Sequence, residues 1–367
     1  MNRMILDGHK LLWHRERVEA WHGGERIAPI TIDCALTRRC TYRCAYCYGQ
    51  LQANDERKMT KDIIFRFLDD AAEISVKAIS FVSDGESTCS PHLYDAILRG
   101  KKNGLDIALG TNGYLLKEEN LEEILACLTY LRFNISAAEP SSYARIMGCK
   151  EECFLVVRDN VKKCVEIKKK NNLDVTIGLQ MVLLPSFKDQ IIPLAELGKE
   201  LGVDYFVIKH CSDDESHTLG IDYSKYFGLT GLLEEAESYS ESDYLVKAKW
   251  SKILSRGERK YSQCYGPAFI MQFSGSGLVA PCGMLFNRKY KKYHIGNIAN
   301  VSFKKIWQSE RYWEVINLIG SEKFDARTMC GSLCLQHKAN EFLWDLKNGK
   351  AVLRDTHGEL PMHINFV

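Results

Sequence analysis

Three cysteines on one short stretch, Cys40, Cys44 and Cys47, have the spacing C-x3-C-x2-C. Cysteine thiolates are the usual ligands of iron–sulfur clusters, and three of them can each bind one iron of a four-iron cubane. The fourth iron then lacks a protein ligand, so the amine and carboxylate of an external molecule can chelate it. A structural zinc site takes four ligands, and the fourth would have to be Cys34 or a distant histidine. We therefore predict a [4Fe–4S] cluster with one open iron.

A second set of cysteines lies near the end of the chain. Cys264, Gly277 and Cys282 have the spacing C-x12-G-x4-C, and Cys330 and Cys334 follow at C-x3-C. Four thiolates suffice for a closed [4Fe–4S] cluster or for zinc, and the spacing alone does not choose between them. The glycine fits a hairpin whose backbone passes close to a bulky group. A closed cluster has no free iron, so we expect it to exchange an electron rather than to bind substrate.

The composition is that of a globular protein with an unusual number of thiols. The chain has 367 residues, 14 cysteines and a formal net charge of +2. This length suits one large domain and a small one. The first residues contain no apolar core of a secretory signal, and no run of about 18 apolar residues is present. We therefore expect a cytoplasmic protein whose clustered thiols bind metal rather than pair as disulfides. The charge gives no reason to expect nucleic acid or a membrane as partner.

The elements that must position these cysteines alternate along the chain between short apolar runs and amphipathic stretches. The runs are rich in β-branched and aromatic residues, which predicts strands, at 30–36, 78–83, 107–111, 130–136, 175–184 and 205–209. Helices are expected after a Thr60 cap, after Ser90-Pro91, and over 118–127, 154–170 and 188–201. Such alternation indicates right-handed crossovers and a parallel sheet. After Lys209 the alternation ends, and an acidic, serine-rich segment with one helical piece follows.

These patterns divide the chain into five parts. We predict an N-terminal arm, a core, a helical linker, an auxiliary-cluster domain and a tail, at 1–29, 30–210, 211–255, 256–345 and 346–367. Among the remaining cysteines, Cys34, Cys127 and Cys164 occupy apolar periodic positions typical of packed thiols.

The first cysteine set resembles the motif of the radical S-adenosylmethionine (SAM) superfamily, with Tyr46 as the aromatic residue before the last cysteine. The resemblance implies that Tyr46 packs near the adenine of SAM. The stretch Ser-Asp-Gly-Glu-Ser after the second strand resembles the family's Gly-Gly-Glu-Pro motif, with Asp84 in place of the first glycine and Ser87 in place of the proline. Gly85 and Glu86 remain, and the resemblance implies that Glu86 accepts hydrogen bonds from the SAM ammonium.

Further polar residues follow successive strands, as in this superfamily. Asn112 follows the third strand, Asn134 and Ser136 end the fourth, and Arg145 lies shortly after. The resemblance implies that they contact the ribose and carboxylate of SAM. It covers about residues 30–210 and implies a partial (β/α)6 TIM-like barrel, in which ligands bind at the carboxyl ends of the strands.

The second cysteine set resembles the auxiliary-cluster extension called SPASM, and in particular its four-cysteine form, called twitch. The resemblance implies a small C-terminal α+β domain that binds a second [4Fe–4S] cluster. It also implies that SAM is cleaved reductively to a 5′-deoxyadenosyl radical that removes a hydrogen atom from a C–H bond. We expect a flavodoxin- or ferredoxin-type electron donor. A zinc-binding or cluster-binding structural protein without catalysis is the alternative from a different class.

The outcome of the reaction depends on where the electron of the substrate radical goes. We expect a two-electron oxidation with the auxiliary cluster as acceptor. An epimerase with a hydrogen-donating cysteine, for which candidates are Cys89, Cys149, Cys153 and Cys211, and a dehydratase are the alternatives. Lys209 and His210, which end the sixth strand, face either the substrate or solvent.

The stretch 10–21 resembles enzymes of carbohydrate and surface-polysaccharide pathways, so we expect a small polar, carbohydrate-like substrate. Maturation of a peptide or protein side chain is the alternative. The arm before the first strand is short for a separate peptide-binding domain, which favours the small substrate.

Overall fold

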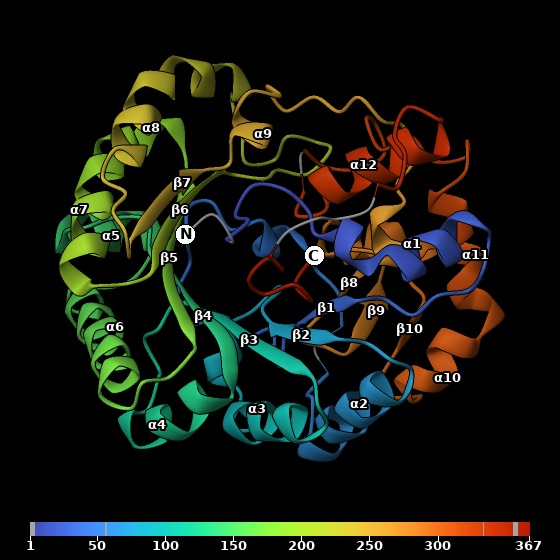
Figure 1. The fold of residues 1–367 in the computed structure, drawn as a ribbon, viewed down its shortest axis with the longest axis horizontal. Coiled ribbons are helices and arrows are strands. Elements are labelled where there is room, and N and C mark those ends of the chain that lie inside the picture. Colours follow the sequence, from blue (N-terminus) through green and yellow to red (C-terminus); the bar gives the residue numbers. More distant parts are fainter. Residues whose placement is uncertain (1–3, 56, 333, 355–358) are drawn as a thin grey trace.

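The computed structural model of the chain describes residues 4–55, 57–332, 334–354 and 359–367, so parts of the predicted arm and tail lie outside the described residues. The described residues contain one ten-stranded sheet in the order β10-β9-β8-β1-β2-β3-β4-β5-β6-β7 (Figure 1). The strands are β1 (Thr31–Cys34), β2 (Ala78–Phe81), β3 (Asp106–Thr111), β4 (Leu128–Asn134), β5 (Thr176–Leu183), β6 (Tyr205–His210), β7 (Leu245–Ala248), β8 (Ile270–Phe273), β9 (Leu278–Ala280) and β10 (Gly296–Asn297).

Neighbouring strands from β8 through β1 to β7 pair in parallel. Strand β9 pairs antiparallel with both β8 and β10. The sheet curves into a barrel that stays open, because β7 and β8 do not pair in the part of the chain that the structure describes (Figure 1). The prediction of a partial barrel is confirmed.

The sheet continues beyond the six strands that the sequence predicts, so the expected end of the alternation at Lys209 is wrong. Strand β7 pairs in parallel with β6, and β8 pairs in parallel with β1 in the register Thr31↔Ile270. Strand β7 escaped detection because it is only four residues long and two of these, Leu245 and Lys247, are half-buried. The first strand of the predicted auxiliary-cluster domain is thus hydrogen-bonded directly to the barrel.

Helices cover the outer face of the curved sheet (Figure 1). They are α1 (Arg15–His22), α2 (Lys61–Glu73), α3 (Leu93–Lys102), α4 (Glu118–Cys127), α5 (Pro140–Met147), α6 (Glu152–Lys170), α7 (Ile191–Leu201), α8 (Thr230–Glu237), α9 (Trp250–Ile253), α10 (Phe303–Gln308), α11 (Glu310–Ile319) and α12 (His337–Lys347). Thr60 caps α2 as predicted, since its side chain accepts a hydrogen bond from the Ile63 N–H. The expected cap at Ser90 is wrong, because α3 begins at Leu93 after a turn.

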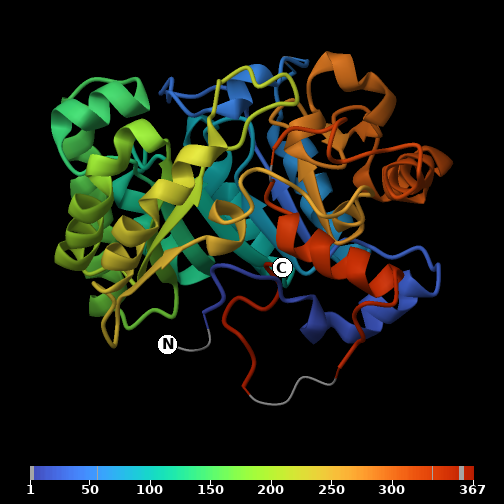
Figure 2. The same cartoon turned by 90° about the horizontal axis from the view of Figure 1, so that it is seen from above.

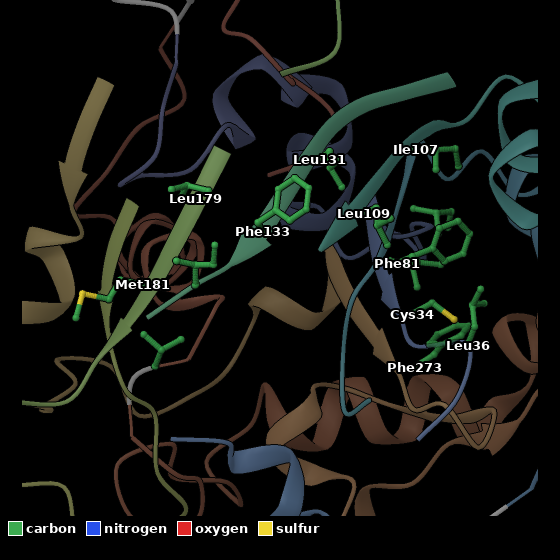
Figure 3. Close-up of a cluster of buried hydrophobic side chains, with 14 of the residues drawn as sticks. Cys34, Leu36, Phe81, Ile107, Leu109, Leu131, Phe133, Leu179, Met181 and Phe273 are labelled. Atoms are coloured by element: carbon green, nitrogen blue, oxygen red, sulfur yellow. The ribbon is translucent and has the colours of Figure 1, made fainter. Parts of the chain in front are cut away.

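Side chains alternate between the two faces of each strand. One set, which includes Cys34, Phe81, Leu131 and Phe273, packs under the helices and forms the core (Figure 3). The ring of Phe273 lies 5.0 Å from that of Phe67 in α2, which identifies this face as the outer one. The other set points into the barrel. Cys34 and Cys164 are buried as predicted, whereas Cys127 is only partly buried.

The C-terminal tail closes the end of the barrel at which the strands begin (Figure 2). Thr31, the first residue of β1, donates its hydroxyl to the Asn365 carbonyl at 2.6 Å. The Thr176 hydroxyl at the start of β5 lies 2.8 Å from Nε2 of His363.

Among the described residues, every helix is too short or too polar to cross a membrane. The other end of the barrel, where the strands finish, carries the first cysteine set.

Candidate active site and auxiliary cysteine cavity

The first cysteine loop leaves the carboxyl end of β1 and is held by the end of helix α5. The Ala45 N–H donates to the Ile146 carbonyl at 2.9 Å, and the Arg43 N–H donates to the Gly148 carbonyl at 3.3 Å. Gly148 has a φ of +63°, and a Cβ there would lie 2.2 Å from the Arg43 carbonyl oxygen. Only glycine allows both this conformation and this approach. The close contact fixes the loop that carries the thiols.

The three thiols lie together at the surface of this loop. Cys40 is exposed, and Cys44 and Cys47 are half-buried. Desolvation by the surrounding loop, with smaller contributions from the nearby Glu86 carboxylate and Cys47 thiol, raises the pKa of Cys40 to about 11. Bound iron would reverse this effect, because a metal holds its coordinating thiols deprotonated. A three-thiol donor set with mutual electrostatic contact fits a cluster ligated by three cysteines.

Glu86 lies beside this loop and is fixed by the ends of two strands. Its Oε1 accepts hydrogen bonds from the Thr88 N–H at 3.0 Å and the Thr111 hydroxyl at 2.7 Å. Its Oε2 accepts the Asn112 N–H at 2.7 Å. The hydroxyl groups of Ser83 and Ser87, on either side of Glu86, are buried without a partner among the described residues. Unpaired buried hydroxyls in this motif fit a polar ligand bound here.

The predicted SAM contacts from β3 and β4 lie at the same end of the barrel. Asn112 donates its side-chain amide to the Thr41 hydroxyl in the cysteine loop at 3.0 Å. The Asn134 side chain accepts a hydrogen bond from Gln180 at 2.6 Å. The Ser136 hydroxyl accepts the Val182 N–H at 3.2 Å. These hydrogen bonds fix the side chains of Asn112, Asn134 and Ser136 at this end of the barrel.

Two further predicted contacts lie in different surroundings. Tyr46 is buried and donates its hydroxyl to the Met147 sulfur at 3.0 Å. Arg145 is exposed on α5, with its guanidinium 5.5 Å from the centre of the Phe187 ring. Among the four cysteines considered as hydrogen donors, Cys211 is buried against the first cysteine loop, with its Sγ 3.4 Å from the Tyr46 carbonyl oxygen.

Gly85 allows the loop after β2 to meet the chain that leads to the cysteines. A Cβ on Gly85 would lie 1.9 Å from the Thr37 carbonyl oxygen, and one on Gly275 would lie 2.1 Å from the Thr37 carbonyl carbon. The β2 loop and the β8–β9 loop therefore enclose Thr37 from two sides. The close approach to Thr37 explains why residue 85 is a glycine. The sequence analysis did not identify Gly275.

Asp84, which replaces a glycine of the superfamily motif, joins the two parts of the site. Its carboxylate is buried and accepts hydrogen bonds from the Ser274 hydroxyl at 2.6 Å and from the Gly275 N–H at 2.9 Å. Arg38 Nε lies 3.3 Å from the same carboxylate, an ion pair without hydrogen-bond geometry. The substitution thus adds a link between β2 and the β8–β9 loop that the sequence comparison did not predict.

The four cysteines of the second set line one small, largely apolar cavity, together with Arg259, Tyr261 and Gln336. These cysteines come from separate segments of the chain, and in the described ranges no three metal-binding side chains are grouped as around a single ion, in either cysteine set. Four thiolates spread around a cavity fit the larger body of a four-iron cluster. Gly277 has a φ of +82°, as expected for the turn between β8 and β9.

Positive charge lies next to these thiols. Arg259 donates through Nη2 to the Cys330 sulfur at 3.8 Å and to the Ser332 carbonyl at 2.8 Å. Lys252 in α9 is buried, and its charge interacts with Cys334. Hydrogen bonds and cations around cluster sulfurs tune the reduction potential of a cluster. Arg259 lies outside the cysteine spacing, so no sequence motif pointed to it.

Two consecutive residues line the auxiliary cavity and a cavity of the barrel. Cys334 lines the cysteine cavity, and its neighbour Leu335 lines a second, larger cavity inside the barrel. The interior cavity is lined by polar groups, among them Asp33, Arg132 and Lys249. Asp33 accepts a hydrogen bond from Gln272 at 3.1 Å.

Comparison with protein families identifies both cysteine sets. The model of the radical SAM superfamily matches residues 35–197, and a model described as an iron–sulfur cluster-binding domain, SPASM, matches residues 264–334. The second match begins at Cys264 and ends at Cys334.

Similar proteins span most of the chain. The tungsten-containing aldehyde ferredoxin oxidoreductase cofactor-modifying protein of Pyrococcus furiosus is 25% identical over 295 residues, which cover 76% of this chain and 80% of that protein. The AdoMet-dependent heme synthase of Methanosarcina barkeri is 25% identical over 312 residues, which cover 77% and 83%.

Solved structures share the fold. Streptococcus suis SuiB bound to S-adenosylmethionine matches with a TM-score of 0.64 at 17% identity, covering 83% of this chain and 72% of SuiB. The protein anSMEcpe with bound AdoMet matches with a TM-score of 0.58 at 15% identity, covering 88% and 95%. At these identities, the likeness establishes the fold alone.

Proposed function

Because this chain belongs to the radical SAM superfamily and carries a SPASM-type iron–sulfur domain, we propose that it oxidises a small polar substrate held inside the barrel. Its cofactors are SAM and [4Fe–4S] clusters. Cys40, Cys44 and Cys47 would hold the SAM-binding cluster, and the four cysteines of the auxiliary cavity would hold the second one. When bound, these groups supply a 5′-deoxyadenosyl radical that takes a hydrogen atom from carbon and an acceptor for one further electron.

The residues of the first site would position SAM. Glu86 and Asn112, held by Thr111 and Thr41, are fixed before any ligand arrives. Preorganised groups hold a ligand in a reactive geometry without further loss of entropy at the moment of reaction. Asn134 and Ser136 lie at the same end of the barrel, and this position is the basis of their proposed contacts with SAM.

The observation that carries the oxidative reaction is the positive charge beside the auxiliary thiols. Reduction makes a cluster more negative, so the nearby Arg259 guanidinium and Lys252 ammonium stabilise the reduced form. Cys334 lines the cavity of these thiols, and the next residue, Leu335, lines the barrel cavity. This arrangement favours acceptance of an electron from a substrate in the barrel.

Removal of a hydrogen atom, then of one electron and one proton, adds up to a two-electron oxidation. Asp33 is suited to accept the proton. Burial raises its pKa to about 6, close to the value that suits a base at neutral pH. Its Oδ2 accepts the Gln272 amide, and its Oδ1 has no hydrogen-bond partner among the described residues.

The test begins with the cofactors. Anaerobically reconstituted protein should contain about eight irons and eight sulfides per chain, and reduction should release 5′-deoxyadenosine from SAM. Replacing the three cysteines of the first set by Ala should abolish this cleavage. The matched change Cys264→Ala should leave uncoupled cleavage and stop formation of the oxidised product. Product formation at the wild-type rate by Cys264→Ala would exclude the auxiliary cluster as electron acceptor.

Modification of a peptide side chain is the second candidate. The structures of SuiB include one bound to precursor peptide SuiA, and those of anSMEcpe include peptide complexes. In this chain the C-terminal tail and the N-terminal arm cover one end of the barrel, which favours a substrate that fits inside. Hydrogen transfer from a deuterated peptide to 5′-deoxyadenosine would identify a peptide substrate.

A further inference from the structure

Four cationic side chains lie close together in and beside the barrel. Arg132 points inward from β4, and Lys209 points inward from β6. Lys249 follows β7 and lines the barrel cavity with Arg132, and Lys252 lies one turn further on in α9. Their charges act on one another, which places them in one cluster.

None of these cations is neutralised by an ion pair within the described residues. The Arg132 guanidinium lies 5.6 Å from the centre of the Tyr130 ring and also interacts with the Tyr205 side chain, and its Nε is buried without a hydrogen-bond partner in those residues. For the ammonium groups of Lys209, Lys249 and Lys252, no described residue provides a hydrogen bond or an ion pair. Arg132, Lys209 and Lys249 are half-buried, and a desolvated cation without a counter-charge is costly, so a bound anion would be stabilised here.

The nearby carboxylates do not balance this charge. Asp33 faces Arg132 and Lys209, and with a pKa of about 6 it supplies one negative charge at neutral pH, which leaves the three cations in excess. Asp7 is engaged by Ser251, whose N–H donates to it at 2.8 Å and whose hydroxyl also donates to it. Burial also lowers the pKa of Lys249 to about 7, so this amine readily gains a proton when an anion approaches.

We propose that Arg132, Lys209 and Lys249 bind an anionic group of the substrate, a carboxylate or a phosphate, inside the barrel. The inference rests on the proposed function and adds the chemical class of its substrate. A guanidinium flanked by ammonium groups matches the oxygens of such anions, because arginine donates two parallel hydrogen bonds and lysine adds point charge. The anion would anchor the substrate between the auxiliary cavity and the SAM end of the barrel.

The site also fits the geometry of the strands. Arg132 pairs in register with Gly110 in β3 and Gly178 in β5. A Cβ on Gly110 would lie 3.7 Å from Arg132 Nη2. Glycine on one neighbouring strand therefore leaves the guanidinium room to move toward a ligand. On the other side, the Tyr205 ring fills the space above Gly178, where a Cβ would lie 2.2 Å from it.

The experiment measures anion binding by the holoprotein without turnover. Inorganic phosphate and succinate are titrated separately at constant ionic strength, with chloride as the control salt, and the thermal midpoint is followed anaerobically. We expect a saturable rise with at least one of the two anions. A response to phosphate alone assigns a phosphorylated substrate, and a response to succinate alone assigns a carboxylated one.

Three variants locate the response. Arg132→Met and Lys249→Met should weaken anion binding by about tenfold or more, since each removes a charge-assisted contact. Lys291→Met, which removes an exposed lysine, should retain the wild-type response. Lys249→Met should also be at least as stable as the wild type without anion, because it removes an unpaired half-buried cation. This stability control distinguishes loss of binding from loss of folding.

The outcomes separate this inference from the proposed function. Wild-type protein that holds its clusters and cleaves SAM, but shows no saturable response to either anion, overturns the anion site and leaves the proposed function intact. The same holds if Arg132→Met and Lys249→Met respond like the wild type. Protein that binds anions in this way but fails to cleave SAM overturns the proposed function instead.

Discussion

The Asp84 carboxylate accepts a hydrogen bond from the Gly275 N–H at 2.9 Å, so the end of β2 is tied directly to the loop of the auxiliary-cluster region. Ser274 donates to the same carboxylate at 2.6 Å, and Arg38 supplies the positive charge at 3.3 Å. This connection lies one residue before Gly85 and two before Glu86. A single buried carboxylate therefore couples the SAM end of the barrel to the hairpin that carries Cys282.

Replacing Asp84 by Ala should destabilise the protein by about 3 kcal/mol, because it removes the ion-pair partner of the half-buried Arg38 and the buried acceptor of the Ser274 hydroxyl and the Gly275 N–H. Asp84→Asn keeps the shape and should cost less. The thermal midpoint of the anaerobic holoprotein measures the effect, with the exposed Asp55→Asn as control. A midpoint for Asp84→Ala within error of that for Asp55→Asn would contradict a structural role for this link.

Gly85→Ala should prevent the loop of the Glu86 motif from closing on the cysteine segment. The added Cβ would lie 1.9 Å from the Thr37 carbonyl oxygen, and the obstacle is backbone rather than a flexible side chain. We expect loss of SAM binding and a reduced iron content, measured by equilibrium dialysis and by iron analysis. Gly228→Ala is a matched control, because a Cβ there meets no atom within 4 Å. Normal SAM affinity in Gly85→Ala would refute this steric requirement.

Arg259→Met should lower the reduction potential of the auxiliary cluster by about 60–120 mV. The estimate converts the loss of a charge-assisted hydrogen bond, about 1.5–3 kcal/mol, into a one-electron potential. Arg259→Lys should fall between this variant and the wild type. Redox titration followed by electron paramagnetic resonance gives the potential directly, and the exposed Arg158→Met should leave it unchanged. An unchanged potential in Arg259→Met would remove the argument that this cavity favours electron acceptance.

Asp33 predicts a specific pH dependence of stability. Burial raises its pKa to about 6 in the folded protein, opposed by Gln272, Arg132 and Lys209, whereas the unfolded value is about 3.9. The folded state therefore binds the proton more tightly, so this group lowers stability as pH rises from about 4 to 6. At pH 7.5 the difference amounts to about 2–3 kcal/mol.

Asp33→Asn removes this titration. We expect the variant to be more stable than the wild type at pH 7.5 and the gap to narrow at pH 5, measured as thermal midpoints at both values. A gap that stays constant between the two pH values would show that the Asp33 carboxyl does not titrate in this range.

The sequence alone determined the cofactor chemistry and the positions of the first six barrel strands. Cysteine spacing is local, and cluster ligation within a loop depends on neighbours along the chain, so Cys40, Cys44 and Cys47 were found without a structure. The strands were also recognisable, because each buried strand is a short run of apolar residues between polar ones. Their bounds shifted by only a few residues, as for β1, which is limited to Thr31–Cys34.

Only the tertiary structure decided which distant residues meet. Strand β7 is too short to be recognised alone, and β8 joins β1 through pairing between segments more than 200 residues apart in sequence. Asp84, Arg132 and Arg259 carry no local signature, because their roles depend on partners from other strands and loops. A side chain's partners across a fold are set by packing and hydrogen bonding in three dimensions, and residue spacing along the chain does not encode them.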